Sequence, residues 1–396
     1  MTQGDNKAFD IAVVGTGGIA AIHARDAARL GGRARLVAAT DTDPERLAEF
    51  GEQWSVARLY PDLDALLDAE RPDLVHLCTP PDLHAAQAMA CLQRGLTVLC
   101  EKPPTRTLAE FDAVAAAARR GGAFACVFQH RFGSGVQTLE RAIASGRLGR
   151  PLTAVCNTLW FRPDDYFDVP WRGGWDNEGG GPTLGHGIHQ IDLLLHLMGP
   201  WDTLDGRAAR IAHPVEFEDV SLAIVTFSSG AVGTVVTSLL SPRELSRIRL
   251  DTASGTLEVN HVYGYSDADW SWTPTPDSTT AATLGRHPGL PNADIAESGA
   301  PADPDTWAAS AGQDLPSNHA AQIDQLVDDL LAGRGHDTTL ASTRPTMEFV
   351  TALYASSIER ETVHRRDLTP SHRFYSSLNG GLPAETVTAR LSLGRL

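Results

Sequence analysis

The chain has 396 residues, which at roughly 100 to 200 residues per domain predicts two or three domains with a core of useful size. It is 42% hydrophobic and 21% charged, a balance typical of a globular protein and too apolar for a disordered one. The 49 acidic residues outnumber the 33 basic ones, and the net charge of −16 repels phosphate backbones and anionic membranes. We therefore expect neither a nucleic-acid partner nor a membrane partner.

The five cysteines form no CxxC pair and stand in apolar segments, where a reduced thiol packs as a small hydrophobe. The first ten residues are polar, and no apolar run approaches the roughly 20 residues that span a bilayer. From these features we expect a cytoplasmic protein.

Residues 1–130 alternate short β-like runs with Ala-rich or amphipathic helical stretches. Such alternation is typical of βαβ units, so it predicts an α/β domain with a doubly wound parallel sheet. The expected strands are Phe9–Val14, Arg35–Thr40, Leu74–Thr79, Thr97–Cys100 and Phe124–Phe128.

Residues 131–396 have a different pattern, in which strand-like runs between residues 203 and 260 follow one another with only turns between them. This predicts an open, mainly antiparallel sheet, and hence an α+β domain. Residues 266–316, rich in Pro, Asp, Ser, Thr and Gly, are expected to form a long loop or insertion. The other expected elements are a strand over 152–161, helices over 136–145, 182–198, 318–332 and 344–361, and an irregular tail.

A dinucleotide site is predicted where the first strand meets its helix, at Gly15-Thr16-Gly17-Gly18-Ile19-Ala20. Gly15 permits a tight turn, Gly17 lets the backbone approach a pyrophosphate, and the helix N-terminus offers free N–H groups. Asp41, at the end of the second run, suits a ribose 2′-hydroxyl and repels a 2′-phosphate, which favours NAD over NADP. Arg46 could still reach such a phosphate. Thr79, Pro80 and His84, after a later strand, should border the same crevice.

Glu101-Lys102-Pro103 again follows a strand, and here the sequence resembles the Gfo/Idh/MocA oxidoreductases, a family of sugar and cyclitol dehydrogenases. The resemblance covers roughly residues 8–260 and the helix near 344–361. It implies an NAD-binding Rossmann domain, a substrate-binding and oligomerisation domain with an open sheet, a small carbohydrate substrate, and a homodimer or homotetramer. The matching pieces are Gly15–Ala20, Asp41, Thr79-Pro80 with His84, Glu101–Pro103, and Glu178–Gly181 through Gly187, His189 and Asp192.

The resemblance also implies roles for individual residues. Lys102 would lie between nicotinamide and substrate as a proton-transfer group, with Glu101 orienting it or nearby backbone. His189 would be the general acid or base, with Asp192 fixing its tautomer. The family's usual Asp four residues before that histidine is Gly185 here. His186 is a third catalytic candidate, since the two histidines and Asp192 share a helix face, although a packed core histidine remains open.

A polar and aromatic segment precedes and overlaps this helix. Aromatic faces stack on sugar C–H surfaces, while Asp and Arg bind hydroxyls or an anionic substituent. The histidines lack HExxH spacing, so no metal is expected. The substrate-binding candidates are Arg131, Arg162, Tyr166, Trp171, Arg172, Asp176, His186 and His189.

Three functions remain open at this stage. The first is an NAD-dependent oxidoreductase acting on a secondary hydroxyl of a sugar, sugar derivative or cyclitol. The second is an NAD-dependent glycosidase that works by transient oxidation, elimination, water addition and re-reduction, with an anionic glycoside such as a sulfoquinovoside as one option. The third is a non-catalytic sensor, which the change at Gly185 would suit.

Overall fold

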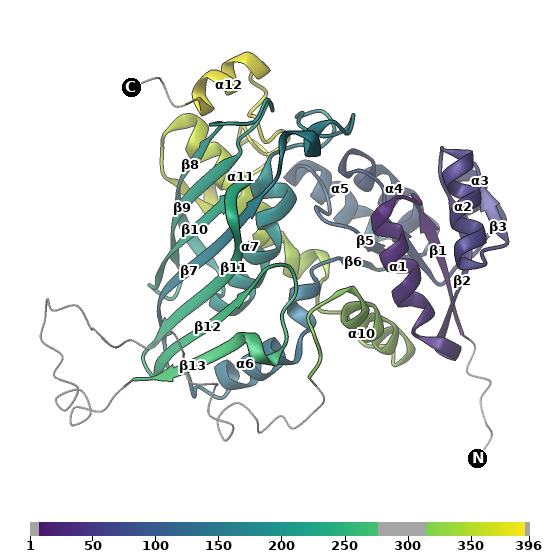
Figure 1. Cartoon of the computed structure of the whole chain (residues 1–396), viewed down its shortest axis with the longest axis horizontal. Helices are drawn as coiled ribbons and strands as arrows, with labels where there is room; N and C mark the ends of the chain where they lie inside the picture. Colours follow the sequence, from purple (N-terminus) through teal and green to yellow (C-terminus); the bar gives the residue numbers. More distant parts are fainter. Residues whose placement is uncertain (1–7, 276–313, 393–396) are drawn as a thin grey trace, which may run out of the picture.

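The computed structural model describes residues 8–275 and 314–392, which build two sheets with helices against them (Figure 1). The first sheet has six parallel strands in the order β3-β2-β1-β4-β5-β6. Because β1 is flanked by β2 and β4, the strand order reverses at β1, which is where doubly wound sheets bind their ligands. The predicted Rossmann fold is confirmed.

The elements of this part alternate along the chain as expected. They are β1 (Phe9–Val14), α1 (Gly18–Ala28), β2 (Ala34–Thr40), α2 (Pro44–Trp54), β3 (Arg58–Tyr60), α3 (Leu63–Ala69), β4 (Leu74–Leu77), α4 (Pro81–Gln93), β5 (Thr97–Cys100), α5 (Leu108–Ala118) and β6 (Phe124–Cys126).

The second sheet has eight strands in the order β13-β12-β11-β7-β10-β9-β8-β14. Its pairs are antiparallel except β7 with β10, which is parallel, so the expected mainly antiparallel sheet is confirmed. The elements are α6 (Ser134–Ala144), β7 (Pro151–Phe161), α7 (Ile188–Met198), β8 (Trp201–Ala209), β9 (Val220–Phe227), β10 (Val232–Ser238), β11 (Leu240–Thr252), β12 (Gly255–His261), β13 (Trp270–Pro274), α10 (His319–Leu331), α11 (Leu340–Glu359), β14 (Val363–His364) and α12 (Ala384–Leu391).

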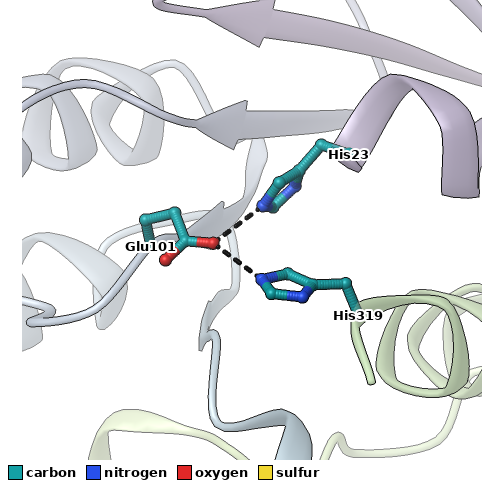
Figure 2. Close-up of side chains that lie close together, drawn as sticks. All are labelled: His23, Glu101 and His319. Atoms are coloured by element: carbon teal, nitrogen blue, oxygen red, sulfur yellow. Dashed lines mark hydrogen bonds and ion pairs between the residues drawn. The ribbon is translucent and has the colours of Figure 1, made fainter. Parts of the chain in front are cut away.

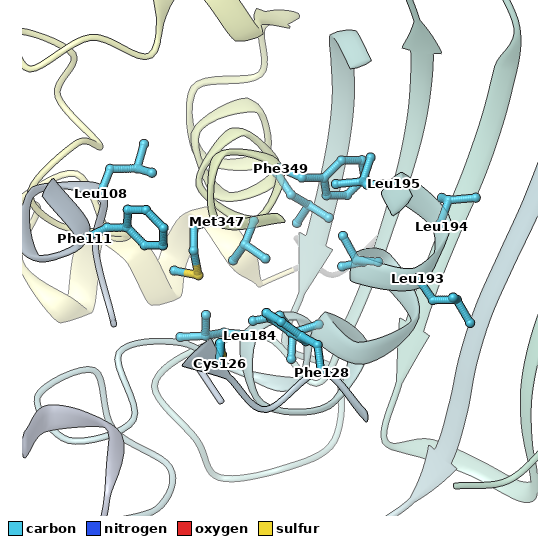
Figure 3. Close-up of a cluster of buried hydrophobic side chains, with 14 of the residues drawn as sticks. Leu108, Phe111, Cys126, Phe128, Leu184, Leu193, Leu194, Leu195, Met347 and Phe349 are labelled. Atoms are coloured by element: carbon cyan, nitrogen blue, oxygen red, sulfur yellow. The ribbon is translucent and has the colours of Figure 1, made fainter. Parts of the chain in front are cut away.

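A shared apolar core joins the two sheets. Met347 and Phe349 of α11 belong to the same buried cluster as Leu193 of α7 and Phe111 of α5 (Figure 3). All four side chains are at most 1% exposed. The helix that closes the second sheet therefore also packs on the first, which fixes the crevice between them.

Helix α10 follows the second sheet in the chain but packs beside α1 of the first (Figure 1). Its Ile323 and Val327 join the buried cluster of Ile11 and Leu74. The C-terminal segment thus returns to the Rossmann sheet and carries His319, at its first turn, to the end of β5.

Some local expectations were wrong. The short β3 and α3 were not predicted, because Arg58 and Leu59 are exposed and three residues give no clear alternation. The tail is not wholly irregular, since it holds β14 and α12. The start of the expected 266–316 loop forms β13, while 276–313 lies outside the described residues. No helix among the described residues is long and apolar enough to span a bilayer.

The helix expected over 182–198 is not one regular helix. A π-helical turn, Thr183–Gly187, precedes α7. Gly185 and Gly187 lower the cost of the wider turn, and such turns recur at functional sites.

Candidate active site

The glycine turn after β1 has the geometry a pyrophosphate needs. Gly15 has φ +83°, and a Cβ there would lie 2.9 Å from Thr79 Cγ2, so only glycine fits without strain. A Cβ at Gly17 would meet nothing within 4 Å, which leaves backbone open to the crevice. Helix α1 begins at Gly18 and points its free N–H groups into this space. These residues fit a dinucleotide, as the sequence predicted.

Asp41, at the end of β2, is held as an anion beside this turn. Its Oδ2 accepts hydrogen bonds from Thr16 N–H at 2.7 Å and Thr16 Oγ1 at 2.9 Å. Arg46 donates from Nη2 to Oδ1 at 2.7 Å and from Nε to Oδ2 at 3.1 Å. Burial opposes ionisation, but these hydrogen bonds, with Arg46 the strongest, lower the pKa of Asp41 to about 2. The arginine that could have reached a phosphate is therefore engaged by the carboxylate.

Lys102 follows β5 and reaches across to the second half of the chain. Its Nζ donates to the carbonyl of Gly185 at 2.7 Å. The ammonium is enclosed enough that burial lowers its pKa, which the nearby carboxylates Glu101 and Glu178 partly oppose. A lysine with a depressed pKa, facing a crevice, can donate a hydrogen bond or, once neutral, accept a proton.

Glu101, the residue before this lysine, belongs to a buried cluster with His23 and His319 (Figure 2). Its Oε1 receives His23 Nε2 at 2.9 Å and His319 Nε2 at 3.0 Å, and His23 in turn meets His76. Burial opposes ionisation of Glu101, but the two imidazole donors hold its pKa well below the usual range. The carboxylate also accepts the backbone N–H of Lys102 at 3.1 Å, which holds the chain directly after β5.

The same cluster has the composition of a metal site. The ligand atoms of His23, Glu101 and His319 lie within 4.8 Å of one another, as do those of Glu140, His196 and Asp337. In the first group, both imidazoles already make hydrogen bonds to the Glu101 carboxylate, and these bonds account for the arrangement.

The π turn and the loop before it form the opposite wall. His186 lies 3.3 Å from the hydroxyl of Tyr166 through its Nε2, and its Nδ1 has no hydrogen-bond partner among the described residues. Arg172 stacks over the Tyr166 ring at 3.8 Å and packs on Trp171 at 4.9 Å. Burial, then the cations Lys102, Arg162 and Arg172, hold the pKa of His186 well below its usual range, so this imidazole is neutral.

His189 and Asp192 correct an expectation. Asp192 does not orient His189, because it forms a bidentate ion pair with Arg131 and accepts a hydrogen bond from Thr346 at 2.9 Å. His189 is stacked on His130 with ring centroids 5.3 Å apart, and neither of its ring nitrogens has a hydrogen-bond partner among the described residues. Arg131 was predicted to bind substrate, but its guanidinium is engaged in this ion pair and the residue is only 4% exposed, so it does not face the substrate.

A single cavity of about 1040 Å³ connects the glycine turn to Lys102 and the π turn. Of the predicted site residues, those lining it are Gly15, Gly17, Gly18, Ile19, Asp41, Thr79, Pro80, Glu101, Lys102, Tyr166, Trp171, Arg172 and His186. Those outside its lining are Thr16, His84, Arg131, Arg162, Asp176 and His189.

The residues outside the lining have other partners, with consequences for their predicted roles. His84 lies 2.7 Å from the Pro103 carbonyl and 2.8 Å from that of Thr79, so it ties two loops together instead of facing cofactor. Arg162 stacks on Trp160 and Tyr166 and pairs with Glu244 at 3.1 Å. Asp176 is exposed.

The sequence analysis assigned no role to two carboxyl groups of the second half of the chain, half-buried Glu178 and fully buried Glu218. Burial raises the pKa of Glu178 and of Glu218 to about 7. Glu178 lines the cavity, whereas Glu218 lies behind it, bound to Thr183 and Tyr354. The sequence feature that could have pointed to Glu178 is its place directly before the three glycines 179–181. The burial that raises its pKa, however, depends on how the surrounding loop folds.

The comparisons with known proteins agree with this arrangement. Residues 9–129 match the oxidoreductase family with an NAD-binding Rossmann fold, and residues 136–258 match the GFO/IDH/MocA C-terminal domain. The chain belongs to the Gfo/Idh/MocA oxidoreductase family. Its Rossmann domain is NAD-binding, and members similar to it are sugar and cyclitol dehydrogenases.

Similar family members cover different shares of the chain. The D-apiose dehydrogenase of Paraburkholderia graminis is 30% identical over 272 residues, which cover 65% of this chain and 69% of that protein. The D-glucoside 3-dehydrogenase of Escherichia coli is 31% identical over 41% of this chain and 46% of its own length. The WlbA dehydrogenase of Chromobacterium violaceum, solved with NADH and UDP-GlcNAcA, superposes with a TM-score of 0.76 at 24% identity, covering 92% of this chain and 97% of that one. This last likeness shows the shared fold.

Proposed function

We propose that this protein oxidises a secondary hydroxyl of a sugar, sugar derivative or cyclitol with NAD, and that Lys102 takes the hydroxyl proton. The single observation that carries the proposal is that Lys102 lines the same cavity as the glycine turn and Asp41. Tyr166, Arg172 and His186 line that cavity too. The similarity to sugar dehydrogenases supports the same substrate class.

Bound NAD supplies the hydride acceptor, and the protein supplies position and proton transfer. Lys102 would hold the reacting hydroxyl by a second hydrogen bond from its Nζ, in addition to the one that Nζ donates to the Gly185 carbonyl. For a second polar contact, His186 is better placed than His189, because His186 lines the cavity while His189 lies outside its lining. A neutral His186 can accept or donate a hydrogen bond without repelling the lysine.

The test is a panel of free sugars and cyclitols with NAD, followed by NADH absorbance. Lys102→Met should lower kcat/KM by about 10²–10⁴, the range for loss of a positioned proton-transfer group, while the NADH dissociation constant stays unchanged. His186→Gln should reduce activity more than His189→Gln. A protein that consumes sugar without any NADH change, or a fully active Lys102→Met variant, would contradict the proposal.

One observation favours a second candidate, the NAD-dependent glycosidase. Elimination of an aglycone needs acid and base groups beyond those for hydride transfer, and Glu178 with a pKa of about 7 is an additional proton carrier in this cavity. Arg172 forms no ion pair within the described residues, so an anionic glycoside is the preferred class to test. Aglycone released from an aryl glycoside without net NADH would favour this reaction, and NADH in step with sugar consumption would exclude it.

A further inference from the structure

The ammonium group of Lys102 is enclosed, yet it has one hydrogen bond and no ion pair among the described residues. Its hydrogen bond goes to a neutral carbonyl, that of Gly185. Glu101 lies close in sequence, but its Oε1 is taken by two imidazoles. An enclosed charge without a counter-charge is costly, so a second carboxylate near the ammonium has a physical function.

Glu178 is placed to be that carboxylate. It lines the same cavity as Lys102, directly before the glycines that lead into the π turn. Its Oε2 accepts the backbone N–H of Gly173 at 2.6 Å, which fixes the carboxyl group in the wall of the cavity. Its Oε1 has no hydrogen-bond partner among the described residues, so one oxygen remains available.

The charges of Lys102 and Glu178 shift each other's pKa. Glu178 opposes the lowering of the pKa of Lys102 that burial causes, and Lys102 opposes the raising of the pKa of Glu178. The other charged groups that act on Glu178 are Arg172, which favours its ionised form, and Glu218, which disfavours it. Burial outweighs them and leaves the pKa of Glu178 at about 7, so this carboxyl can change its charge at neutral pH.

We propose that Glu178 is the proton acceptor for Lys102, a positioning residue that resets the lysine between turnovers. The inference rests on the proposed oxidation. In that reaction the substrate O–H bond breaks and an N–H bond forms on neutral Lys102, while the C–H electron pair leaves as hydride to NAD. The lysine N–H bond then breaks, an O–H bond forms on Glu178, and water in the cavity takes the proton from the carboxyl.

Space at Gly185 provides a direct check on this assignment. A Cβ there would meet nothing within 4 Å, so an aspartate at this position can enter the cavity without a clash. Because the Gly185 carbonyl already binds Lys102, the new carboxylate would arise beside the ammonium. Glu218 provides the matched control, since its pKa is also about 7 but it lies outside the cavity lining.

The first experiment does not depend on turnover. Competitive labelling of the Lys102 amine with acetic anhydride across a pH series, read by mass spectrometry, gives the pKa of the lysine in the NADH complex. Glu178→Gln should lower that pKa, because a counter-charge is lost, and Glu218→Gln should leave it unchanged. An unchanged Lys102 profile in Glu178→Gln overturns the inference, whether or not a sugar substrate has been found.

The second experiment uses the best substrate of the panel. In the wild type, kcat should rise with pH through about 7, because Glu178 must be ionised to take the proton from Lys102 and reset the lysine. Glu178→Gln should lose this rise with pH and lose at least about tenfold in rate at neutral pH, whereas Glu178→Asp should keep the rise. Glu218→Gln should keep the rise and the rate, with the rise moved to lower pH, because the charge of Glu218 helps to raise the pKa of Glu178. Adding Gly185→Asp to Glu178→Gln should restore part of the rate. A rise with pH that persists in Glu178→Gln overturns the inference while leaving the proposed oxidation intact.

Discussion

Replacement of Asp41 by serine should shift the cofactor preference from NAD toward NADP. Asp41 is ionised, with its pKa lowered to about 2, and it receives two nitrogen donors at 2.7 Å, Thr16 N–H and Arg46 Nη2. A ribose 2′-hydroxyl that donates to this carboxylate gains about 1.5–3 kcal/mol as a charged hydrogen bond. A 2′-phosphate at roughly 4 Å would instead meet a repulsion of about 4 kcal/mol at an effective dielectric constant of 20.

Asp41→Ser removes both effects and releases the Arg46 guanidinium, which is 47% exposed and can turn to a phosphate. Screening by solvent and salt reduces the electrostatic part, so we expect the ratio of NADPH to NADH affinity to rise by at least about 10², which is about 2.7 kcal/mol. Fluorescence titration with each reduced cofactor measures the ratio without a sugar.

Arg46→Gln supplies the control for this prediction. Adding it to Asp41→Ser should remove most of the gained NADPH affinity, since the arginine makes the new contact. A ratio that stays constant in Asp41→Ser, or a gain that survives the loss of Arg46, would refute the assignment of this carboxylate to the ribose.

Further variants test the fold around the site. Gly15→Ala should lower the free energy of unfolding by at least about 1–2 kcal/mol in denaturant titration, because φ is +83° and the new Cβ would lie 2.9 Å from Thr79 Cγ2; unchanged stability would argue against this turn. Arg131→Met should cost about 3–5 kcal/mol by leaving buried Asp192 uncompensated, and pairing it with Asp192→Leu should recover much of that loss. Glu101→Gln should have a lower free energy of unfolding than the wild type at pH about 6, and this difference should shrink as the pH falls toward about 3. The reason is that a carboxyl whose pKa is depressed in the folded state stabilises the fold above its unfolded pKa and loses that contribution as it becomes protonated. A difference that stays constant with pH would contradict an ionised Glu101. Ile224→Asp, on the open face of the second sheet where Ile224 is 59% exposed, should weaken the expected oligomer in light scattering, and an unchanged mass would exclude this face from the contact.

The sequence by itself determined the first sheet and the cofactor end of the cavity. There the signals are local: a glycine that must adopt a positive φ, a helix start three residues later, and an acidic residue at the end of the next strand. Each follows from backbone geometry within a few residues, so spacing along the chain is enough to predict that Gly15 and Asp41 border the same crevice, and both line one cavity.

Only the tertiary structure decided which polar side chains of the second half face the cavity. Regular helical spacing predicts His186, His189 and Asp192 on one helix face, but only His186 of the three lines the cavity. Asp192 forms an ion pair with Arg131, which is 61 residues away in the chain. Glu178 gained its role in the same way, because its burial beside Lys102 depends on a loop folded against another sheet. Ion pairs, burial and the pKa values they set are properties of long-range contacts, which a local pattern of residues does not encode.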